Sequence, residues 1–126
     1  MFCEGCNSPV FFGRSFYEKA FGFKKRFIHE NGLFAEMEME GAALHFAANE
    51  AVKANLPKGF QENNPSNLPA GIEVCLVTDN VTDAFAKAIN AGAVAYTEPK
   101  VMFWGQTIAY VRDLDGILIE IGNSSW

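Results

Sequence analysis

Two stretches of the chain have apolar residues at the spacing of an amphipathic helix, and each lies between a capping residue and a glycine. In the first, Ser8 caps the helix, Pro9 takes its first position, and Gly22 fits the left-handed position that ends it. Its apolar face is formed by Phe12, Phe16 and Ala20. The pattern predicts a helix within residues 8–23 that leads into strand-like sequence.

The second stretch repeats this plan in residues 80–93. Asn80 is the cap and Gly92 the stop. The apolar face is formed by Val81, Phe85, Ala88 and Ile89. Because the same sequence pattern occurs twice, we expect a pseudo-symmetric domain whose ligand site lies where its two halves meet.

Alternating and apolar runs around these helices predict strands. The expected strands are residues 2–7, 24–30, 33–39 and 42–48 in the first half, and 71–78, 94–97, 106–112 and 117–122 in the second. The order is β-α-β-β-β, twice. We therefore predict an α+β fold of two βαβββ modules paired around a cleft, with mixed, largely antiparallel sheets and helices on the outer face. The modules are about 1–50 and 71–126, joined by a linker at about 51–70, in a single domain of 1–126.

The turns predict which residues share a face of the first sheet. Two-residue loops at Asn31-Gly32 and Glu40-Gly41 place Phe27 opposite Glu36. The face expected against the helix carries Ala35, Met37, Met39, Leu44 and Phe46. The opposite face carries Phe27, His29, Phe34, Glu36, Glu38 and His45.

In the second half, a four-residue turn at 113–116 gives an analogous division. The expected core side carries Ile108, Tyr110, Ile117, Ile119 and Ile121, with Thr107, Ala109, Leu118 and Glu120 on the other side. In the strand at 71–78, Ile72, Val74 and Leu76 lie on one side, and Glu73, Cys75 and Val77 on the other.

One predicted face thus collects acidic side chains: Glu36, Glu38, Glu73 and Glu120, together with His45. Such a face in an antiparallel sheet is often solvated. Glu73 and Glu120, however, interrupt strongly apolar strands, and Glu is rarely buried without a partner or a function. The second interpretation is that these carboxylates line a cleft, interleaved with Phe27 and Phe34. His45 beside Glu36 is either a ligand or one half of a cross-strand pair.

Composition narrows the class of protein. The 126 residues suit one domain, and 49% of them are hydrophobic, which favours a folded core. No apolar run approaches the ~20 residues of a membrane span, and the net charge of −5 with scattered Lys and Arg disfavours nucleic acid as a partner. Three cysteines, Cys3, Cys6 and Cys75, suit a reducing compartment, so we expect a cytoplasmic protein. Cys3 and Cys6 have the spacing of half a zinc site or of a redox pair, but no second Cys/His pair follows, which favours ordinary thiols without such a role.

Several motifs together resemble one family. They are residues 16–23 (FYEKAFGF), 71–74 (GIEV), 79–81 (DNV), 91–93 (AGA), 104–113 (WGQTIAYVRD), 115–116 (DG) and 119–121 (IEI). The set resembles the vicinal oxygen chelate superfamily, which is the glyoxalase, bleomycin-resistance and dioxygenase group. That resemblance implies paired βαβββ modules around a cleft and a homodimer.

In metal-bearing members the resemblance also implies four ligand positions. The first falls on Phe2, which cannot ligate a metal. The others fall at or near His45, at Glu73 and at Glu120. A divalent metal held by His45, Glu73 and Glu120 would polarise a substrate oxygen or stabilise an enediolate.

Three functions follow from these observations. The preferred one is a small-molecule binder of the bleomycin-resistance type that holds an aromatic or cationic ligand without metal. Its expected ligand-binding residues are Phe27, Phe34, Glu36, His45, Glu73, Trp104, Gln106 and Glu120. The alternative is a divalent-metal lyase, isomerase, transferase or dioxygenase. The second alternative is a non-catalytic dimerisation domain.

Overall fold

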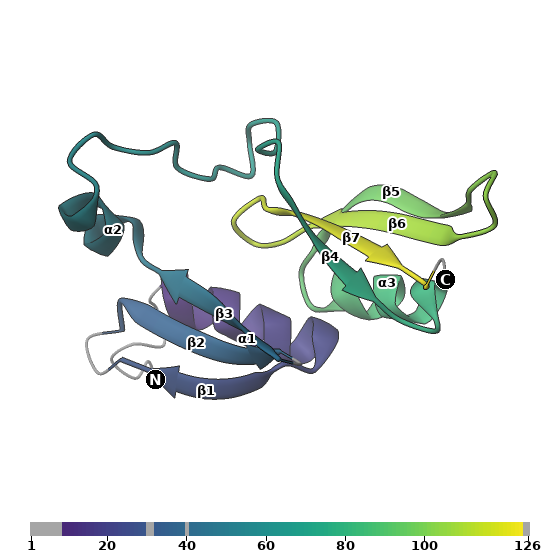
Figure 1. Ribbon diagram of the computed structural model, residues 1–126, viewed down its shortest axis with the longest axis horizontal. Coiled ribbons are helices and arrows are strands. Elements are labelled where there is room, and N and C mark those ends of the chain that lie inside the picture. Colours follow the sequence, from purple (N-terminus) through teal and green to yellow (C-terminus); the bar gives the residue numbers. More distant parts are fainter. Residues whose placement is uncertain (1–8, 30–31, 40, 125–126) are drawn as a thin grey trace. The chain divides into compact units, whose positions relative to one another are not determined.

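The computed structural model describes residues 9–29, 32–39 and 41–124, and it has the expected α+β fold (Figure 1). The chain divides into two compact units. The first comprises Met1–Glu18 and Gly22–Glu62, and the second comprises Lys19–Phe21 and Asn63–Trp126. The main division falls inside the linker predicted at 51–70. Within the described residues, no helix is both long enough and apolar enough to cross a bilayer.

The first unit contains a three-stranded antiparallel sheet in the order β1-β2-β3. Its elements are α1 (Pro9–Phe21), β1 (Lys24–Ile28), β2 (Phe34–Met39), β3 (Ala42–Ala47) and α2 (Asn49–Asn55). The last turn of α1, Lys19–Phe21, is grouped with the second unit. Gly22 follows α1 with a φ of 71°, as expected for a helix stop. The predicted strand at 2–7 and the residues Phe2, Cys3, Cys6, Ser8, Asn31 and Glu40 lie outside the described residues.

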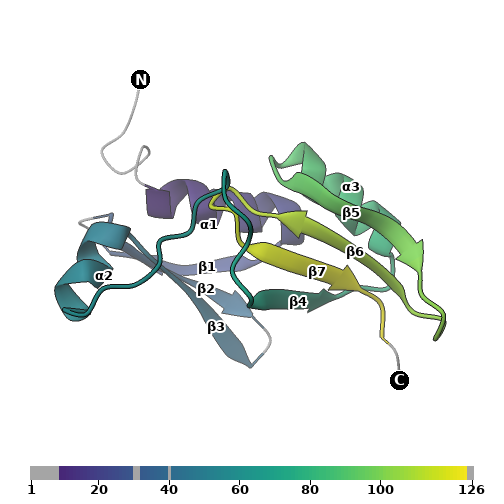
Figure 2. The same ribbon diagram turned by 90° about the horizontal axis from the view of Figure 1, so that it is seen from above.

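The register predicted for this sheet is confirmed. Phe27 pairs with Glu36, and Glu36 pairs in turn with His45. The opposite face carries Ala35, Met37, Leu44 and Phe46, of which Ala35 and Met37 are buried. Helix α1 runs along that face, and the ring of Tyr17 lies 5.2 Å from the ring of Phe46 (Figure 2). The helix and sheet therefore share one apolar core.

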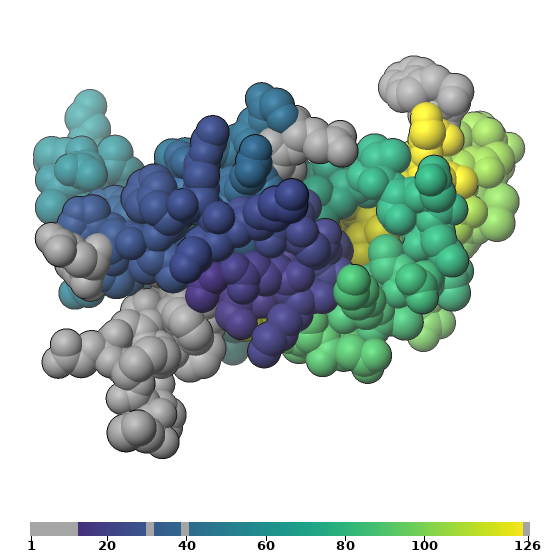
Figure 3. Space-filling view, turned by 90° about the horizontal axis from the view of Figure 1, so that it is seen from below, coloured from purple at the N-terminus to yellow at the C-terminus, as the bar shows by residue number. Residues whose placement is uncertain are grey.

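Strand β1 forms an edge of this sheet and is exposed at four of its five residues. In Figure 3, side chains in the dark-blue part of the chain, which contains β1, project from the surface. Arg26 is an extra residue in β1, because the pairing register shifts between Lys25 and Phe27. Such a bulge bends an edge strand and discourages its pairing with another chain.

The second unit has the βαβββ order predicted for it. Its elements are β4 (Glu73–Val77), α3 (Val81–Asn90), β5 (Val94–Val101), β6 (Thr107–Arg112) and β7 (Leu118–Gly122). The sheet order is β4-β7-β6-β5, with β4 parallel to β7 and the other pairs antiparallel. The Asn80 side chain accepts a hydrogen bond from the Asp83 backbone at 3.1 Å, which confirms Asn80 as the cap of α3.

The predicted pairing of β6 with β7 was wrong by one residue, so the two faces of β6 were exchanged. The four-residue turn pairs Arg112 with Ile117, whereas the structure pairs Arg112 with Leu118. Ile117 belongs to the loop, where its backbone N–H donates to Asp113 Oδ1 at 2.8 Å and its carbonyl accepts from the Asp113 N–H at 3.0 Å. A slip of one residue moves every side chain to the other face. Ile108 and Tyr110 therefore share the face of Glu120.

The core side of this sheet is instead formed by Ala109, Val111, Ile119 and Ile121, which are all at most 1% exposed. Helix α3 packs on the sheet with Ala88 and Val81 buried (Figure 1). Helix α3 covers one face of the sheet, and Tyr110 and Glu120 lie on the opposite face. That face carries the candidate site.

Candidate functional site

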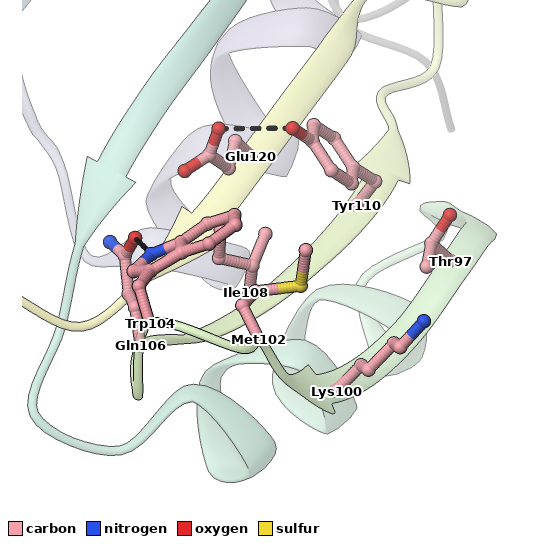
Figure 4. Close-up of a pocket in the computed structure, with 8 residues that line it drawn as sticks. All are labelled: Thr97, Lys100, Met102, Trp104, Gln106, Ile108, Tyr110 and Glu120. Atoms are coloured by element: carbon pink, nitrogen blue, oxygen red, sulfur yellow. Dashed lines mark hydrogen bonds between the residues drawn. The ribbon is translucent and has the colours of Figure 1, made fainter.

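A pocket of about 450 Å³ lies on the face of the second sheet opposite α3 (Figure 4). It is built from β5, β6 and β7 and from the loop that joins β5 to β6. Its lining residues are Thr97, Lys100, Met102, Trp104, Gln106, Ile108, Tyr110 and Glu120. We refer to it as the β5–β7 pocket. All eight residues belong to the second unit, so this unit builds the pocket by itself.

Glu120 stands at one side of the β5–β7 pocket, on β7. The phenol of Tyr110, directly opposite on β6, donates to Glu120 Oε2 at 3.1 Å. The thiol of Cys75, opposite on β4, donates to Glu120 Oε1 at 3.6 Å. Both carboxylate oxygens thus accept a hydrogen bond from a neighbouring strand. The side chain is held in one position on the sheet, with its carboxylate at the pocket (Figure 4).

The acidic surroundings of Glu120 change the titration of its neighbours. Burial, followed by the hydrogen bond and the charge of Glu120, raises the pKa of Tyr110 to about 12. The same causes raise the pKa of the Cys75 thiol, which disfavours a thiolate nucleophile there. Burial first, and then Glu120, also raises the pKa of Glu73. Tyr110 and Cys75 therefore act as hydrogen-bond donors near neutral pH.

Trp104 lines the β5–β7 pocket from the loop between β5 and β6 and is half exposed. Its indole N–H donates to Gln106 Oε1 at 2.8 Å, and Gln106 Nε2 donates to the Asn123 carbonyl at 2.7 Å (Figure 4). The loop closes on itself, because the Met102 N–H donates to the Gln106 carbonyl at 2.8 Å. This chain of contacts fixes the indole on a short hairpin and gives the pocket an aromatic wall.

The predicted ligand-binding residues fall into two groups. Trp104, Gln106 and Glu120 line the β5–β7 pocket. Glu73 lies on β4, one strand beyond Glu120, and is not part of the lining. The other four, Phe27, Phe34, Glu36 and His45, lie on the sheet of the first unit. Their role in ligand binding stays a prediction.

Sequence reasoning missed the pocket residues Thr97, Lys100, Met102, Ile108 and Tyr110. Ile108 and Tyr110 were assigned to the core because the last turn was taken as four residues long. The signal that could have corrected this is Asp113, whose carboxylate can accept backbone N–H groups of the turn. A five-residue loop anchored by Asp113 would have brought Tyr110 opposite Glu120.

In the first unit, the carboxylate of Glu36 contacts two basic side chains, Arg26 and His45. Glu36 Oε1 lies 2.6 Å from His45 Nε2, and Glu36 Oε2 lies 3.2 Å from an Arg26 nitrogen. The Glu36 side chain is only 14% exposed, whereas that of His45 is 66% exposed. The arrangement fits the interpretation of His45 as one half of a cross-strand pair.

Comparison with known proteins defines the family. A model of the Glyoxalase/Bleomycin resistance protein/Dioxygenase superfamily matches residues 13–121. The chain belongs to this superfamily. Comparison with proteins of curated function gave no match.

Solved structures share the superfamily fold with this chain. A glyoxalase-related enzyme from Fulvimarina pelagi is 18% identical, with a TM-score of 0.79 over 93% of this chain and 81% of its own. A glyoxalase/bleomycin resistance protein/dioxygenase family enzyme from Burkholderia phytofirmans PsJN is 21% identical, with a TM-score of 0.75 over 93% of this chain and 91% of its own. TioX from Micromonospora sp. ML1 is 19% identical, with a TM-score of 0.61 over 86% of this chain and 84% of its own.

The metal that the superfamily implies can be tested against the donor atoms. Among the residues that the structure describes, no group of three or more His, Cys, Asp or Glu side chains is placed to hold a metal ion. His45 is paired with Glu36 in the first unit, and both oxygens of Glu120 accept hydrogen bonds in the second. The donors within either unit thus do not fit a metal site, and the set His45, Glu73 and Glu120 stays a prediction.

Proposed function

We propose that this superfamily member is a small-molecule binding protein, and that its β5–β7 pocket takes an aromatic ligand carrying a cationic group, without metal. The observation that carries the proposal is the pairing of a fixed indole with a fixed carboxylate in one hollow. Trp104 supplies the aromatic wall and Glu120 the negative charge. Ligand pockets are typically apolar concavities with a few placed polar groups.

The apolar part of the pocket suits a flat ligand. Ile108, 8% exposed, lies on β6 in the centre of the lining, and Met102 and Trp104 come from the adjoining loop. A flexible thioether fills gaps against an aromatic ring, and an indole face attracts both rings and cations. Tyr110 adds a second ring on the side of Glu120.

The β7 side of the pocket, where Glu120 lies, suits a cation. Glu120 offers a carboxylate that Tyr110 and Cys75 orient, and Glu73 lies beside it on β4. The whole chain carries a net charge of −5, which attracts cationic ligands over a longer range. An open hollow of about 450 Å³ also favours a binder over a domain used only for dimerisation.

Titration with aromatic amines tests the proposal. In a Trp126→Phe background, Trp104 is the remaining tryptophan, so quenching of its fluorescence reports on the pocket. Isothermal titration of the same ligands gives independent affinities. We expect Glu120→Gln and Trp104→Ala each to weaken binding at least tenfold, because each removes one of the two recognition elements.

Glu98→Gln is the matched control. Glu98 is an exposed carboxylate on β5 of the same unit and does not line the pocket. Its substitution should change the affinity less than twofold. An equal loss in Glu98→Gln and Glu120→Gln would contradict the proposal. A metal measurement could contradict it as well. The proposal is wrong if protein purified without chelator contains one equivalent of divalent metal and the Glu120→Gln variant does not.

A further inference from the structure

The β5–β7 pocket carries a second charge, of opposite sign to Glu120. Lys100 lines it from β5, whereas Glu120 lines it from β7, and β6 runs between them (Figure 4). Lys100 pairs with Ile108 on β6, and Glu120 pairs with Tyr110. The two charged residues therefore flank an apolar and aromatic strip.

Neither charge neutralises the other. Among the described residues, Lys100 makes no ion pair or side-chain hydrogen bond. The side-chain partners of Glu120 are Tyr110, Cys75 and the neighbouring carboxyl of Glu73, and none of them is a cation. A lysine that lines a pocket without a carboxylate partner is available to an anionic group of a ligand. The hydroxyl of Thr97 lines the same side of the pocket.

The separation of the two charges sets the length of a matching ligand. Glu120 and Lys100 lie two strands apart, and their partners on β6, Tyr110 and Ile108, are two residues apart along that strand, which places the two backbones about 12 Å from each other. Both residues line the pocket, with the Lys100 side chain on the side of Thr97, so a ligand that contacts both must span a gap of this order (Figure 4). A benzene ring with a charged group at each end is of that length.

We propose that the ligand of the β5–β7 pocket is an organic zwitterion, with a cationic nitrogen at Glu120 and a carboxylate at Lys100, joined by an apolar or aromatic body. This inference rests on the proposed function and adds the second charged group. The body would lie over Ile108 with Trp104 beside it, and the Thr97 hydroxyl would donate to the carboxylate. An amine without the carboxylate would leave Lys100 unpaired and would place two positive charges in one pocket.

Three probes with the same ring separate the contributions. They are 4-(aminomethyl)benzoate, which carries both charges, 4-methylbenzylamine, which carries only the cation, and 4-methylbenzoate, which carries only the anion. We expect 4-(aminomethyl)benzoate to bind at least tenfold more tightly than 4-methylbenzylamine. Because that advantage is electrostatic, it should shrink as the salt concentration rises.

Lys100→Gln should remove the advantage of 4-(aminomethyl)benzoate without weakening the binding of 4-methylbenzylamine. Glu120→Gln should weaken both. The matched control is Lys87→Gln, since Lys87 is an exposed lysine on α3, which packs on the other face of the sheet. It should change each affinity less than twofold.

The possible failures are distinguishable. If 4-methylbenzylamine binds but 4-(aminomethyl)benzoate binds no more tightly, or if Lys100→Gln has no effect, the zwitterion is wrong while the proposed function stands. If 4-methylbenzoate binds most tightly, both the zwitterion and the preference for cations are wrong. If none of the three binds at millimolar concentration, the proposed function falls and this inference with it.

Discussion

Tyr110 and Glu120 lie directly opposite each other on the antiparallel strands β6 and β7, and the phenol donates to the carboxylate at 3.1 Å. The same pairing places both residues on the open face of the sheet, in the β5–β7 pocket. The contact thus contributes to the sheet and to the site together.

Tyr110→Phe should lower the free energy of unfolding by about 1 kcal/mol at neutral pH, the typical net value of one hydrogen bond. The pKa of Tyr110 rises from about 10 to about 12 on folding, so the folded state retains a proton that the unfolded state loses. The stability due to Tyr110 is therefore complete below pH 10 and is lost as the pH rises to 12. Urea unfolding between pH 8 and pH 12 should show a shallower alkaline decline in Tyr110→Phe.

Tyr96→Phe is the control for the alkaline experiment, because Tyr96 is about half exposed and does not line the pocket. Its alkaline decline should match that of the unmodified protein. Absorbance at 295 nm follows the phenolates directly. If as many phenolates form between pH 10 and pH 12 in Tyr110→Phe as in the unmodified protein, the assignment of the raised pKa to Tyr110 is wrong.

Glu73→Gln should make the protein slightly more stable at pH 7. The Glu73 side chain is largely exposed, but its partial burial and then the neighbouring Glu120 raise its pKa above 4.5, so its ionised form is disfavoured in the folded state. The stability linked to its proton is full below pH 4.5 and is lost as the pH rises through the folded pKa. Because the side chain is exposed, the gain should be less than about 1 kcal/mol. Thermal unfolding at pH 7 and pH 4 checks this, and a gain that persists undiminished at pH 4 would contradict it.

Asp113→Ala should cost about 2 to 3 kcal/mol, because two partly buried backbone donors lose their acceptor. Asp113 is 3% exposed, and its Oδ1 accepts from the N–H groups of Asp115 and Ile117 at 2.9 and 2.8 Å. Asp113→Asn keeps an acceptor oxygen and should retain most of the stability. Urea unfolding of both variants checks this, and equal losses would show that the carboxamide oxygen cannot replace the carboxylate.

Gly116→Ala should destabilise the loop that Arg112 holds. The buried guanidinium of Arg112 donates to the carbonyls of Gly116, Pro65, Asn67 and Asn64. A Cβ on Gly116 would lie 2.8 Å from Pro65 Cα, at a φ of 89°. We expect a loss above about 2 kcal/mol, since the strain of positive φ and the clash add. Limited proteolysis should cut the segment at 61–70 faster.

Gly59→Ala separates those two effects. Gly59 also has a positive φ, 81°, but a Cβ there would meet nothing within 4 Å. It should cost only the backbone strain, about 1 kcal/mol. If the two variants lose the same stability in urea unfolding, the contact of Gly116 with Pro65 contributes nothing.

The sequence by itself determined the elements and much of their pairing. The caps, the apolar spacing and the glycine stops defined α1 and α3, because these signals act within a few residues. The hairpins of the first sheet followed from short turns, so that Glu36 was placed correctly between Phe27 and His45. The family motifs were also readable, and residues 13–121 match the superfamily.

Only the tertiary structure decided the face of β6 and the composition of the pocket. The length of the last loop depends on two hydrogen bonds to the Asp113 carboxylate, and one extra loop residue reverses every side chain of β6. Lys100 and Glu120 face the same pocket because β5, β6 and β7 are adjacent, with 19 residues between the two positions in the chain. Local patterns report on neighbours within a turn or a hairpin, whereas a pocket depends on the register of strands joined through loops of exact length.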